Sequence, residues 1–334
     1  MDSNVLIVRS FEENSEAEWD NFVLNQSVNG TFLQTRRFLN YHRAGKFIDA
    51  SYMVLDSKGK TVAVCPACMI MENGRKTFFS HMGSTYGGII IGEKWYKTHK
   101  VIEVIRALEN EWIKEGFEKI ILKQTPGILS SSKSDLLDYC YYYLRYNSVL
   151  ELNLYVDFSE YNENILSSIA QGKRTNIHNC EKVGCVCREL HTVEEMTTFH
   201  NLLKLTLKKY DKEPIHTVDE LLEFQNQRLV NECRFYGIFK DDEMIAGSMM
   251  FYFEKTRVAH AQYLCADPTY HTLSPMSYMY YSMLCEAKKQ GYEKVSWGIV
   301  TEDMGLYLNE GLTKSKEAFG STYGVNHTYV KELQ

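Results

Sequence analysis

The chain of 334 residues is longer than one hydrophobic core usually organises, so the sequence predicts two domains. Hydrophobic residues make up 44% and charged residues 24%, which are ordinary values for a folded globular protein and exclude a disordered chain. Lys plus Arg number 37 against 43 Asp plus Glu, and the net charge of -6 excludes a global electrostatic attraction to nucleic acid.

The first half of the sequence predicts an antiparallel meander followed by a helix. The expected strands are 52–55, 61–71 and 77–81. Apolar residues then recur at helical spacing from Val101 to Trp112, and Gly116 ends this helix. A short apolar run, 119–123, predicts one more strand.

The second half predicts the same order of elements. The expected strands are 235–239, 244–253 and 257–264. A helix begins at Ser274-Pro275, because Pro suits the first helical position, and it ends at Gly291. Nearly identical phrases, Gly116-Phe-Glu-Lys-Ile120 and Gly291-Tyr-Glu-Lys-Val295, follow the two helices. Two copies of one α/β unit explain this repeat.

Helices are also expected before the second meander. Their ranges are 161–182, 193–210 and 217–232. The last of them opens with a capping box, Thr217-Val-Asp-Glu220. We therefore predict an α/β (α+β) protein of two units, 1–150 and 151–334, each with a mixed, mostly antiparallel sheet flanked by helices.

The sequence shows no pattern typical of export or of membrane insertion. The longest apolar run, 61–71, contains Pro66 and is far shorter than the roughly 20 residues of a membrane helix. The first residues carry neither a basic leader nor an apolar stretch typical of a signal peptide. We expect a cytoplasmic protein without membrane insertion.

Nine cysteines form an odd count, unlike the even count of a disulfide framework. Cys65 and Cys68 form a C-x-x-C pair inside a predicted strand, and no second pair completes a zinc site. Cys180, Cys185 and Cys187 cluster, but a fourth ligand is missing from the pattern. The sequence therefore predicts reduced thiols that pack in the core, and no metal.

Besides the repeat, four sequence segments follow one another along the chain in an order that is typical of a known family. They are Gly30–Leu39, Lys173–Val186, Leu273–Gly291 and Asn309–Gly320. Together with the order of elements, these phrases resemble the FemAB-like peptidyl and aminoacyl transferases, which carry the GNAT acyltransferase fold in two tandem copies. The resemblance covers most of the chain, and it implies two GNAT-like units and an acyl-transfer activity.

One motif of the GNAT fold is missing. GNAT enzymes usually hold the pyrophosphate of acetyl-CoA on a Gln/Arg-x-x-Gly-x-Gly/Ala turn, because bare backbone N–H groups at a helix N-terminus bind phosphate. The corresponding stretch, Asp267–Pro275, contains no glycine. Acyl-CoA and aminoacyl-tRNA therefore both remain open as the donor.

The resemblance suggests four catalytic candidates near the end of the second copy. Lys316 matches the family's lysine before Phe-Gly, where a cation offsets the charge that develops on the reacting carbonyl oxygen. Tyr307 resembles the GNAT tyrosine that protonates the leaving group. Asp267 and His271 directly follow a predicted strand and are placed to accept the amine proton, although Asp267 fits a turn-capping role as well.

Five further residues are candidates for substrate binding. Arg36 and Arg37 follow the first phrase, where family members contact the acceptor, and their forked donors suit a phosphate. Tyr86 lies in a glycine-rich link and is a candidate to line the acceptor cleft, although a structural turn explains this segment as well. Arg174 belongs to a basic helical face, and Glu302 follows the last strand of the repeat as an alternative acid. Solvated surface positions explain these charged residues equally well.

These observations predict an N-acyltransferase that acts on the amino group of an amino sugar or peptide in cell-envelope polymer biosynthesis, including polysaccharide pathways. An aminoacyl-tRNA-dependent peptidoglycan bridge transferase is one alternative, although the net charge of -6 does not favour a tRNA partner. A non-catalytic ligand-binding module on the same fold is another. The sequence leaves the donor, the glycan-precursor or small-molecule acceptor and the oligomeric state open.

Overall fold

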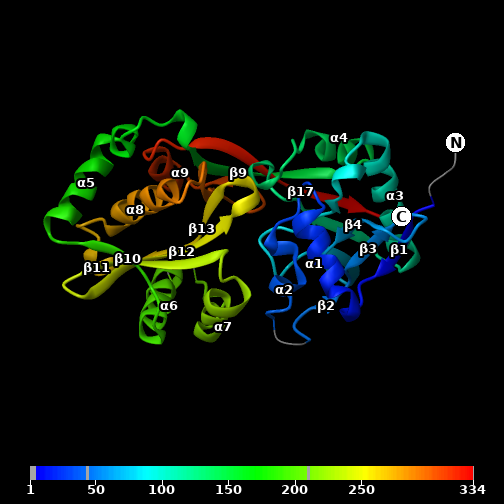
Figure 1. The fold of residues 1–334 in the computed structure, drawn as a ribbon, viewed down its shortest axis with the longest axis horizontal. Helices are drawn as coiled ribbons and strands as arrows, with labels where there is room; N and C mark the ends of the chain where they lie inside the picture. Colours follow the sequence, from blue (N-terminus) through cyan, green and yellow to red (C-terminus); the bar gives the residue numbers. More distant parts are fainter. Residues whose placement is uncertain (1–4, 43–44, 209–210, 334) are drawn as a thin grey trace. The chain divides into compact units, whose positions relative to one another are not determined.

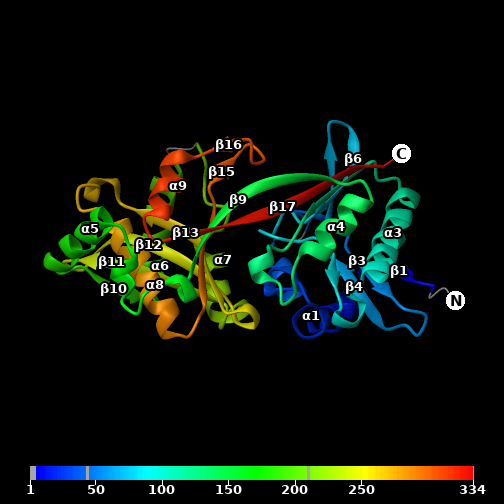
Figure 2. The same cartoon turned by 90° about the horizontal axis from the view of Figure 1, so that it is seen from above.

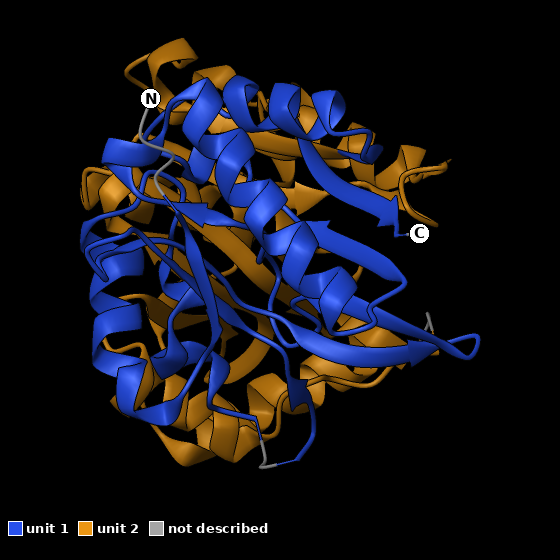
Figure 3. Ribbon diagram, turned by 90° about the vertical axis from the view of Figure 1, so that its right-hand side faces the viewer, with its two compact units in different colours: residues 1–151, 325–334 blue, residues 152–324 orange. Residues whose placement is uncertain are grey.

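The computed structural model describes residues 5–42, 45–208 and 211–333. The chain forms two compact units: unit 1 comprises residues 1–151 and 325–334, and unit 2 comprises residues 152–324 (Figure 3). Both combine sheet and helix, which confirms the predicted α/β class. Among the helices of the described ranges, none has the length and apolar character that crossing a bilayer requires.

Unit 2 contributes six neighbouring strands to a mixed sheet, in the order β10–β11–β12–β13–β14–β9. The strands are β10 (Val186–Glu189), β11 (Cys233–Lys240), β12 (Glu243–Phe253), β13 (Val258–Ala266), β14 (Lys294–Ile299) and β9 (Asn147–Asp157). Neighbouring strands are antiparallel except β13 and β14, which run parallel. A parallel pair needs a crossover connection, and here a helix provides it.

Helices cover both faces of this sheet. The helices of one face are α5 (Gln171–Lys182) and α8 (Pro275–Lys289), and those of the other are α6 (Val193–Lys208) and α7 (Val218–Glu223) (Figure 1). The crossover helix α8 buries Met279, Met283 and Ala287 against the sheet, as its spacing predicts. A short helix, α9 (Glu310–Glu317), follows β14 and the two-stranded ribbon of β15 (Thr301–Glu302) and β16 (Tyr307–Leu308).

Unit 1 contains two sheets. The first has the order β1 (Ile7–Ser10), β3 (Tyr52–Leu55), β4 (Thr61–Cys65) and β7 (Ile90–Ile91). The second has the order β17 (Thr322–Glu332), β8 (Lys119–Lys123), β6 (Arg75–Ser80), β5 (Cys68–Glu72) and β2 (Ile48–Asp49). The chain from Val325 onward groups with unit 1 because β17 pairs with β8.

The helices of unit 1 complete its core. They are α1 (Glu16–Asn25), α2 (Arg36–Leu39), α3 (Thr98–Lys114) and α4 (Asp135–Tyr143). Figure 2 labels α1, α3 and α4. The predicted apolar face of α3, from Val101 to Trp112, is fully buried in the main core cluster. Trp19 and Phe22 of α1 pack instead against Met53 and Val64, on the other side of β3 and β4.

Three predicted elements differ from the structure. The expected strand 61–71 is two strands in different sheets, because Pro66 has no N–H and interrupts the ladder between β4 and β5. Of the expected helix 161–182 only α5 is an α-helix, and 3₁₀ turns precede it. The expected helix 217–232 stops at Glu223 and continues as a π-helical turn. The end of the predicted helix 193–210 lies outside the described residues.

The cysteines are free thiols, and most of them are buried. Cys65 lies in the core of unit 1, and Cys180 and Cys185 lie in the core of unit 2. Burial raises the pKa of the Cys180 thiol to about 12, so the sulfur stays protonated. Within the described ranges, His, Cys, Asp and Glu side chains form no group of three that suits a metal ion.

Candidate active site

In unit 2, two parallel strands separate and leave an opening in the sheet. Pairing between β13 and β14 covers only 258–260 on β13, opposite 294–296 on β14. β13 then continues to Ala266 and β14 to Ile299. Within the described chain, segment 261–266 therefore has a strand partner only on its β12 side. An unpaired strand edge offers backbone N–H and C=O groups to a ligand.

A cavity of about 680 Å³ lies at this opening. Its walls come from β13, the first turn of α8, the helices α5, α6 and α9, and Trp297 of β14. Its lining includes five polar side chains of chemical interest: Lys173, Asp267, His271, Tyr280 and Lys316. A concave, partly apolar site with a few convergent polar groups is typical of small-molecule binding.

Lys316 places a buried amine at the end of β14. The side chain is 3% exposed, and its Nζ donates to the carbonyl oxygens of Trp297 (2.6 Å), Gly298 (3.2 Å) and Ile299 (3.1 Å). These three acceptors match the three protons of an ammonium group. Burial nevertheless lowers the pKa of Lys316 to about 7, because a charged group loses hydration there.

His260 lies beside this lysine in the core of the sheet. Its Nδ1 is 3.1 Å from the hydroxyl oxygen of Ser296, the residue that faces it across the parallel pair. Burial and the nearby charge of Lys316 lower the pKa of His260 to about 4, so the imidazole is neutral at physiological pH. Beside the opening therefore lie the Lys316 amine, which is about half protonated at pH 7, and the neutral imidazole of His260.

Aromatic rings form the wall next to Lys316. The ring of Tyr280 stacks on Phe319, with centroids 4.8 Å apart, and meets Trp297 edge-on at 4.6 Å. Lys173 of α5 extends its Nζ to within 3.0 Å of the Ser315 hydroxyl and lies near the Phe319 ring. Burial lowers the pKa of Lys173 as well. Two amines and an aromatic wall thus converge on one cavity.

Asp267 and His271 lie at the rim of the same cavity, in the turn between β13 and α8. The Asp267 carboxylate accepts hydrogen bonds from the backbone N–H and the hydroxyl of Thr269. It therefore caps a 3₁₀ turn, one of the two roles expected for it. His271 Nδ1 lies 3.1 Å from the carbonyl oxygen of Pro268. The structure thus brings Lys316, Asp267 and His271 together.

Three other predicted residues of unit 2 do not line this cavity. Tyr307 and Glu302 face each other across the ribbon of β15 and β16, and Tyr307 is 59% exposed. Arg174 donates from its guanidinium to the carbonyl oxygen of Ile169. The neighbouring Lys173 is the basic residue of this helix that reaches the cavity.

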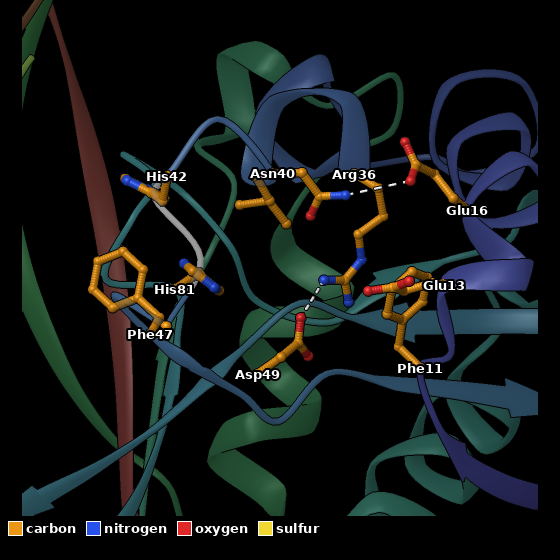
Figure 4. A pocket seen from close by; sticks show the side chains of 11 residues that line it. Phe11, Glu13, Glu16, Arg36, Asn40, His42, Phe47, Asp49 and His81 are labelled. Atoms are coloured by element: carbon orange, nitrogen blue, oxygen red, sulfur yellow. Dashed lines mark hydrogen bonds and ion pairs between the residues drawn. The ribbon is translucent and has the colours of Figure 1, made fainter. Parts of the chain in front are cut away.

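The predicted residues of unit 1 lie in different surroundings. Arg36 is 1% exposed, forms an ion pair with Asp49 and lines a separate cavity of about 770 Å³ (Figure 4). Arg37 does not line that cavity, although its backbone N–H donates to Asp20. Tyr86 is buried, and burial raises the pKa of its hydroxyl. Of these three residues, Arg36 alone lines a described cavity.

Sequence reasoning missed Tyr280, Lys173 and His260. Tyr280 is one of the buried residues of α8, so its position in the sequence indicates a core residue. Lys173 is the neighbour of Arg174, which we had chosen as the candidate from this helix. His260 carried one usable signal, since a histidine inside a buried strand needs a polar partner.

Comparisons with known proteins agree with this geometry. Residues 168–304 match the family described as acetyltransferase (GNAT) domain. Those residues include β13, α8, β14 and Lys173, and they end before Lys316. A comparison with curated proteins finds no match.

Solved structures resemble the whole chain. FemX has a TM-score of 0.70 at 11% identity, covering 98% of this chain and 97% of that chain. L-PGS from Bacillus licheniformis has a TM-score of 0.62 at 11% identity, with 97% and 92% covered. A tandem GNAT protein from the clavulanic acid biosynthesis pathway has a TM-score of 0.57 at 10% identity, with 98% of both chains covered. Residues 168–304 therefore match a GNAT acetyltransferase domain, and the chain as a whole has the tandem, Fem-like fold.

Proposed function

We propose that the unit 2 cavity transfers an acyl or aminoacyl group to the amino group of an amino sugar or peptide that enters a cell-envelope polymer. The observation that carries this proposal is the buried Lys316 ammonium at the point where β13 and β14 separate. A cation held in a site with little water stabilises a developing oxyanion far better than one in bulk water.

In the proposed reaction, the acceptor amine attacks the carbonyl carbon of the donor, and negative charge develops on the carbonyl oxygen. Backbone N–H groups on the open edge of β13 are available to that oxygen, in the manner of an oxyanion hole. Because the carbonyl oxygens of Trp297, Gly298 and Ile299 take up the ammonium protons, Lys316 acts through its charge and holds the end of β14 in place.

The attacking amine must be neutral and must lose a proton during amide formation. Asp267 and His271 line the cavity at its rim and are the groups that we assign to accept this proton, directly or through water. Asp267 already accepts two hydrogen bonds on one oxygen, so its second oxygen is the available acceptor. When the tetrahedral intermediate collapses, the bond between the carbonyl carbon and the donor's leaving group breaks, and the thiol or hydroxyl that departs takes up a proton.

The start of α8 argues for a donor other than free acetyl-CoA. Pro275 occupies the first helical position and has no N–H, and Asp267 adds a negative charge nearby. Both features weaken the attraction of this helix N-terminus for a pyrophosphate. An aminoacyl ester of tRNA is the donor that avoids this requirement, with Lys173 as a nearby cation.

The names of the similar structures suggest which acceptors to test. FemX and a lysylphosphatidylglycerol synthetase both share the fold, so peptide, amino-sugar and lipid acceptors belong in one panel. The purified protein is incubated with labelled acetyl-CoA or labelled aminoacyl-tRNA and each acceptor, and amide products are detected by mass spectrometry. We expect product with one donor class, lost in Lys316→Met and kept in Lys314→Met.

Lys314 is a matched control because it lies on the same helix, is exposed and pairs with Glu310. Absence of product with both donors and all acceptors would favour a non-catalytic binding module. Equal product from both variants would place the chemistry away from this cavity.

A further inference from the structure

Three consecutive carbonyl oxygens at the end of β14 turn toward one nitrogen atom. The Lys316 amine donates to the C=O groups of residues 297–299. In a regular strand, successive C=O groups point alternately toward the two neighbouring strands, so three in a row cannot meet at one atom. The backbone of β14 therefore departs from regular strand geometry here, and contacts outside the strand ladder must hold that conformation.

The departure is a β-bulge in β14, opposite β9. Between the partners Tyr155 and Asn153, β14 advances three residues, from 296 to 299, while β9 advances two. The bulge includes Gly298, whose φ of +76° is a left-handed conformation that favours glycine. A bulge bends its strand, and this one directly follows the last pair of β14 with β13. It therefore lies where the two parallel strands separate.

The Ser296 hydroxyl makes three hydrogen bonds at the start of this bulge. Its Oγ donates to Asn153 Oδ1 (3.4 Å) and accepts from the backbone N–H of Gly298 (3.3 Å). Because its one proton goes to Asn153, the contact of 3.1 Å with His260 Nδ1 is donated by the imidazole. The side chains of His260, Ser296 and Asn153 are buried. One hydroxyl thus joins β9, β14 and β13 at the level of the bulge.

The energetics favour this arrangement over a regular strand. A buried donor that loses its acceptor keeps its desolvation cost, so moving the Gly298 N–H away from the Ser296 oxygen is unfavourable. The imidazole of His260 is neutral, because burial and the charge of Lys316 lower its pKa to about 4. It therefore provides an N–H to Ser296 without adding a second positive charge beside the Lys316 amine.

We propose that Ser296 and His260 are positioning residues for Lys316. Their hydrogen bonds hold the bulge of β14, and the bulge turns the C=O groups of 297–299 toward the amine and directs β14 away from β13. Neither residue belongs to the described lining of the unit 2 cavity, so both act through the backbone and not on a substrate. The inference rests on the proposed function only for the part that Lys316 plays in acyl transfer.

The direct test observes the Lys316 ammonium group by NMR and needs no substrate. Lysine Nζ atoms are labelled with ¹⁵N, and spectra are recorded at about pH 5.5, more than one unit below the pKa of Lys316, which is about 7. Ammonium protons that are held by three carbonyl oxygens exchange slowly with water and give a signal. We expect such a signal in the parent protein and its absence in Lys316→Met.

A pair of serine variants tests the hydroxyl. Ser296→Ala should raise the exchange rate of the Lys316 ammonium protons by on the order of tenfold or more, which broadens or removes the signal, because the bulge loses its acceptor. Ser248→Ala is the matched control: Ser248 is buried in β12 of the same sheet, and its hydroxyl has no hydrogen-bond partner among the described residues. This control loses the same atom but no contact, and it should keep the signal.

A pair of histidine variants tests the imidazole. His260→Leu removes the donor to Ser296 and should weaken the Lys316 signal as Ser296→Ala does. His260→Asn places an amide N–H near the position of Nδ1 and should restore the signal. With the donor and acceptor identified by the panel, Ser296→Ala should also lower kcat about tenfold and leave KM within about twofold, because Ser296 does not touch substrate.

Circular dichroism checks that each variant folds. If Ser296→Ala does not fold, Gly298→Ala tests the same bulge through its positive φ, with Gly184→Ala, at φ of +78° after α5, as the control. A Lys316 signal that is absent from the parent, or unchanged in the folded Ser296 and His260 variants, would overturn the inference. Loss of the signal in these variants, together with a parent that transfers no acyl group, would support the positioning role and contradict the proposed function.

Discussion

Each unit contains one equivalent pair of parallel strands, and the two pairs differ in how far the strands continue beyond their pairing. In unit 1, β6 and β8 pair from Thr77 to Ser80, and Ser80 is the last residue of β6. In unit 2, β13 continues for six residues beyond its last pair with β14, from Ala261 to Ala266. The same order of elements thus gives a closed sheet in unit 1 and an open edge in unit 2.

Backbone from the following loop closes the position in unit 1. Gly87 N–H donates to the carbonyl oxygen of Lys123 at 2.8 Å, directly after the end of the strand pair. Gly88 has φ of +76°, and a Cβ there would lie 2.7 Å from Gln124 Oε1. Only glycine allows this close approach. In unit 1 the loop at Gly87 and Gly88 therefore occupies the position next to the end of β8 that is open beside β13 in unit 2.

The helices after the last strand also differ. In unit 2, the Lys316 amine of α9 donates to backbone carbonyl oxygens at the end of β14. In unit 1, the Tyr141 hydroxyl of α4 donates to Gln124, which directly follows β8. A neutral hydroxyl provides far less electrostatic stabilisation of an oxyanion than a buried cation. This difference is the reason why we propose the acyl transfer for unit 2.

Replacing Lys316 in unit 2 and Tyr141 in unit 1 by side chains without the amine or the hydroxyl should give the largest difference in kcat. Lys316→Met should lower kcat by on the order of a hundredfold or more, because it removes the buried amine whose positive charge is proposed to stabilise the oxyanion. Tyr141→Phe should leave kcat within about twofold, since it deletes one hydrogen bond in the other unit and costs about 1 kcal/mol of stability. Steady-state kinetics with the donor and acceptor identified by the panel measures both.

A large loss of kcat in Tyr141→Phe, with the fold intact, would contradict the assignment of chemistry to unit 2. Lys314→Met, on the exposed face of α9, controls for any loss of charge on this helix.

The sequence predicted the order of elements well but not the opening. Helix α3 and helix α8 follow from their apolar spacing and their glycine ends, which are local signals. The separation of β13 and β14 depends on where a long-range pairing stops, and no local pattern encodes that point. Lys316 was found only through a family phrase, because its burial is a tertiary property.

The wrong strand prediction has the same origin. Residues 61–71 form an apolar run, yet β4 and β5 belong to different sheets because Pro66 interrupts the pairing. The sequence also did not show that Phe11, Trp19 and Asp49 surround the Arg36 side chain, because these residues are distant from it along the chain.

The pKa of Lys316 should also show in folding stability. Burial lowers it to about 7, below the value of about 10.4 for lysine in an unfolded chain. Between these values the unfolded state binds more protons, so stability rises with pH, and below pH 7 the whole penalty is present. Relative to Lys316→Met, the parent should gain up to about 2.5 kcal/mol of unfolding free energy between pH 7 and pH 9.

Urea denaturation of the parent and the variant at several pH values measures this difference. Lys314→Met is the matched control on the same helix, because its side chain is exposed. A difference between parent and Lys316→Met that stays constant from pH 7 to pH 9 would mean that the native ammonium is not destabilised.

The start of α8 allows a prediction about the affinity for free acetyl-CoA as a donor. We expect free acetyl-CoA to bind at least tenfold more weakly than a micromolar complex, a difference of about 1.4 kcal/mol, because Pro275 and Asp267 disfavour its pyrophosphate. Calorimetry measures the affinity. Asp267→Asn removes one negative charge and should strengthen binding modestly. A micromolar Kd for the parent protein would show that other N–H groups replace the missing turn.

The smallest expected difference concerns two capping boxes, one in each unit. Thr31 and Gln34 form a box that is buried, with Gln34 also donating to Thr125 at 2.9 Å, while Thr217 and Glu220 form an exposed one at the start of α7. Thr217→Ala should cost about 1 kcal/mol, the usual value for a lost cap. Thr31→Ala should cost about 2 kcal/mol, because it also leaves buried polar groups without a partner. Denaturation of both Ala variants, with the Thr→Ser variants as controls that keep the hydroxyl, tests the order; equal losses at the two sites would mean that burial adds nothing to the first box.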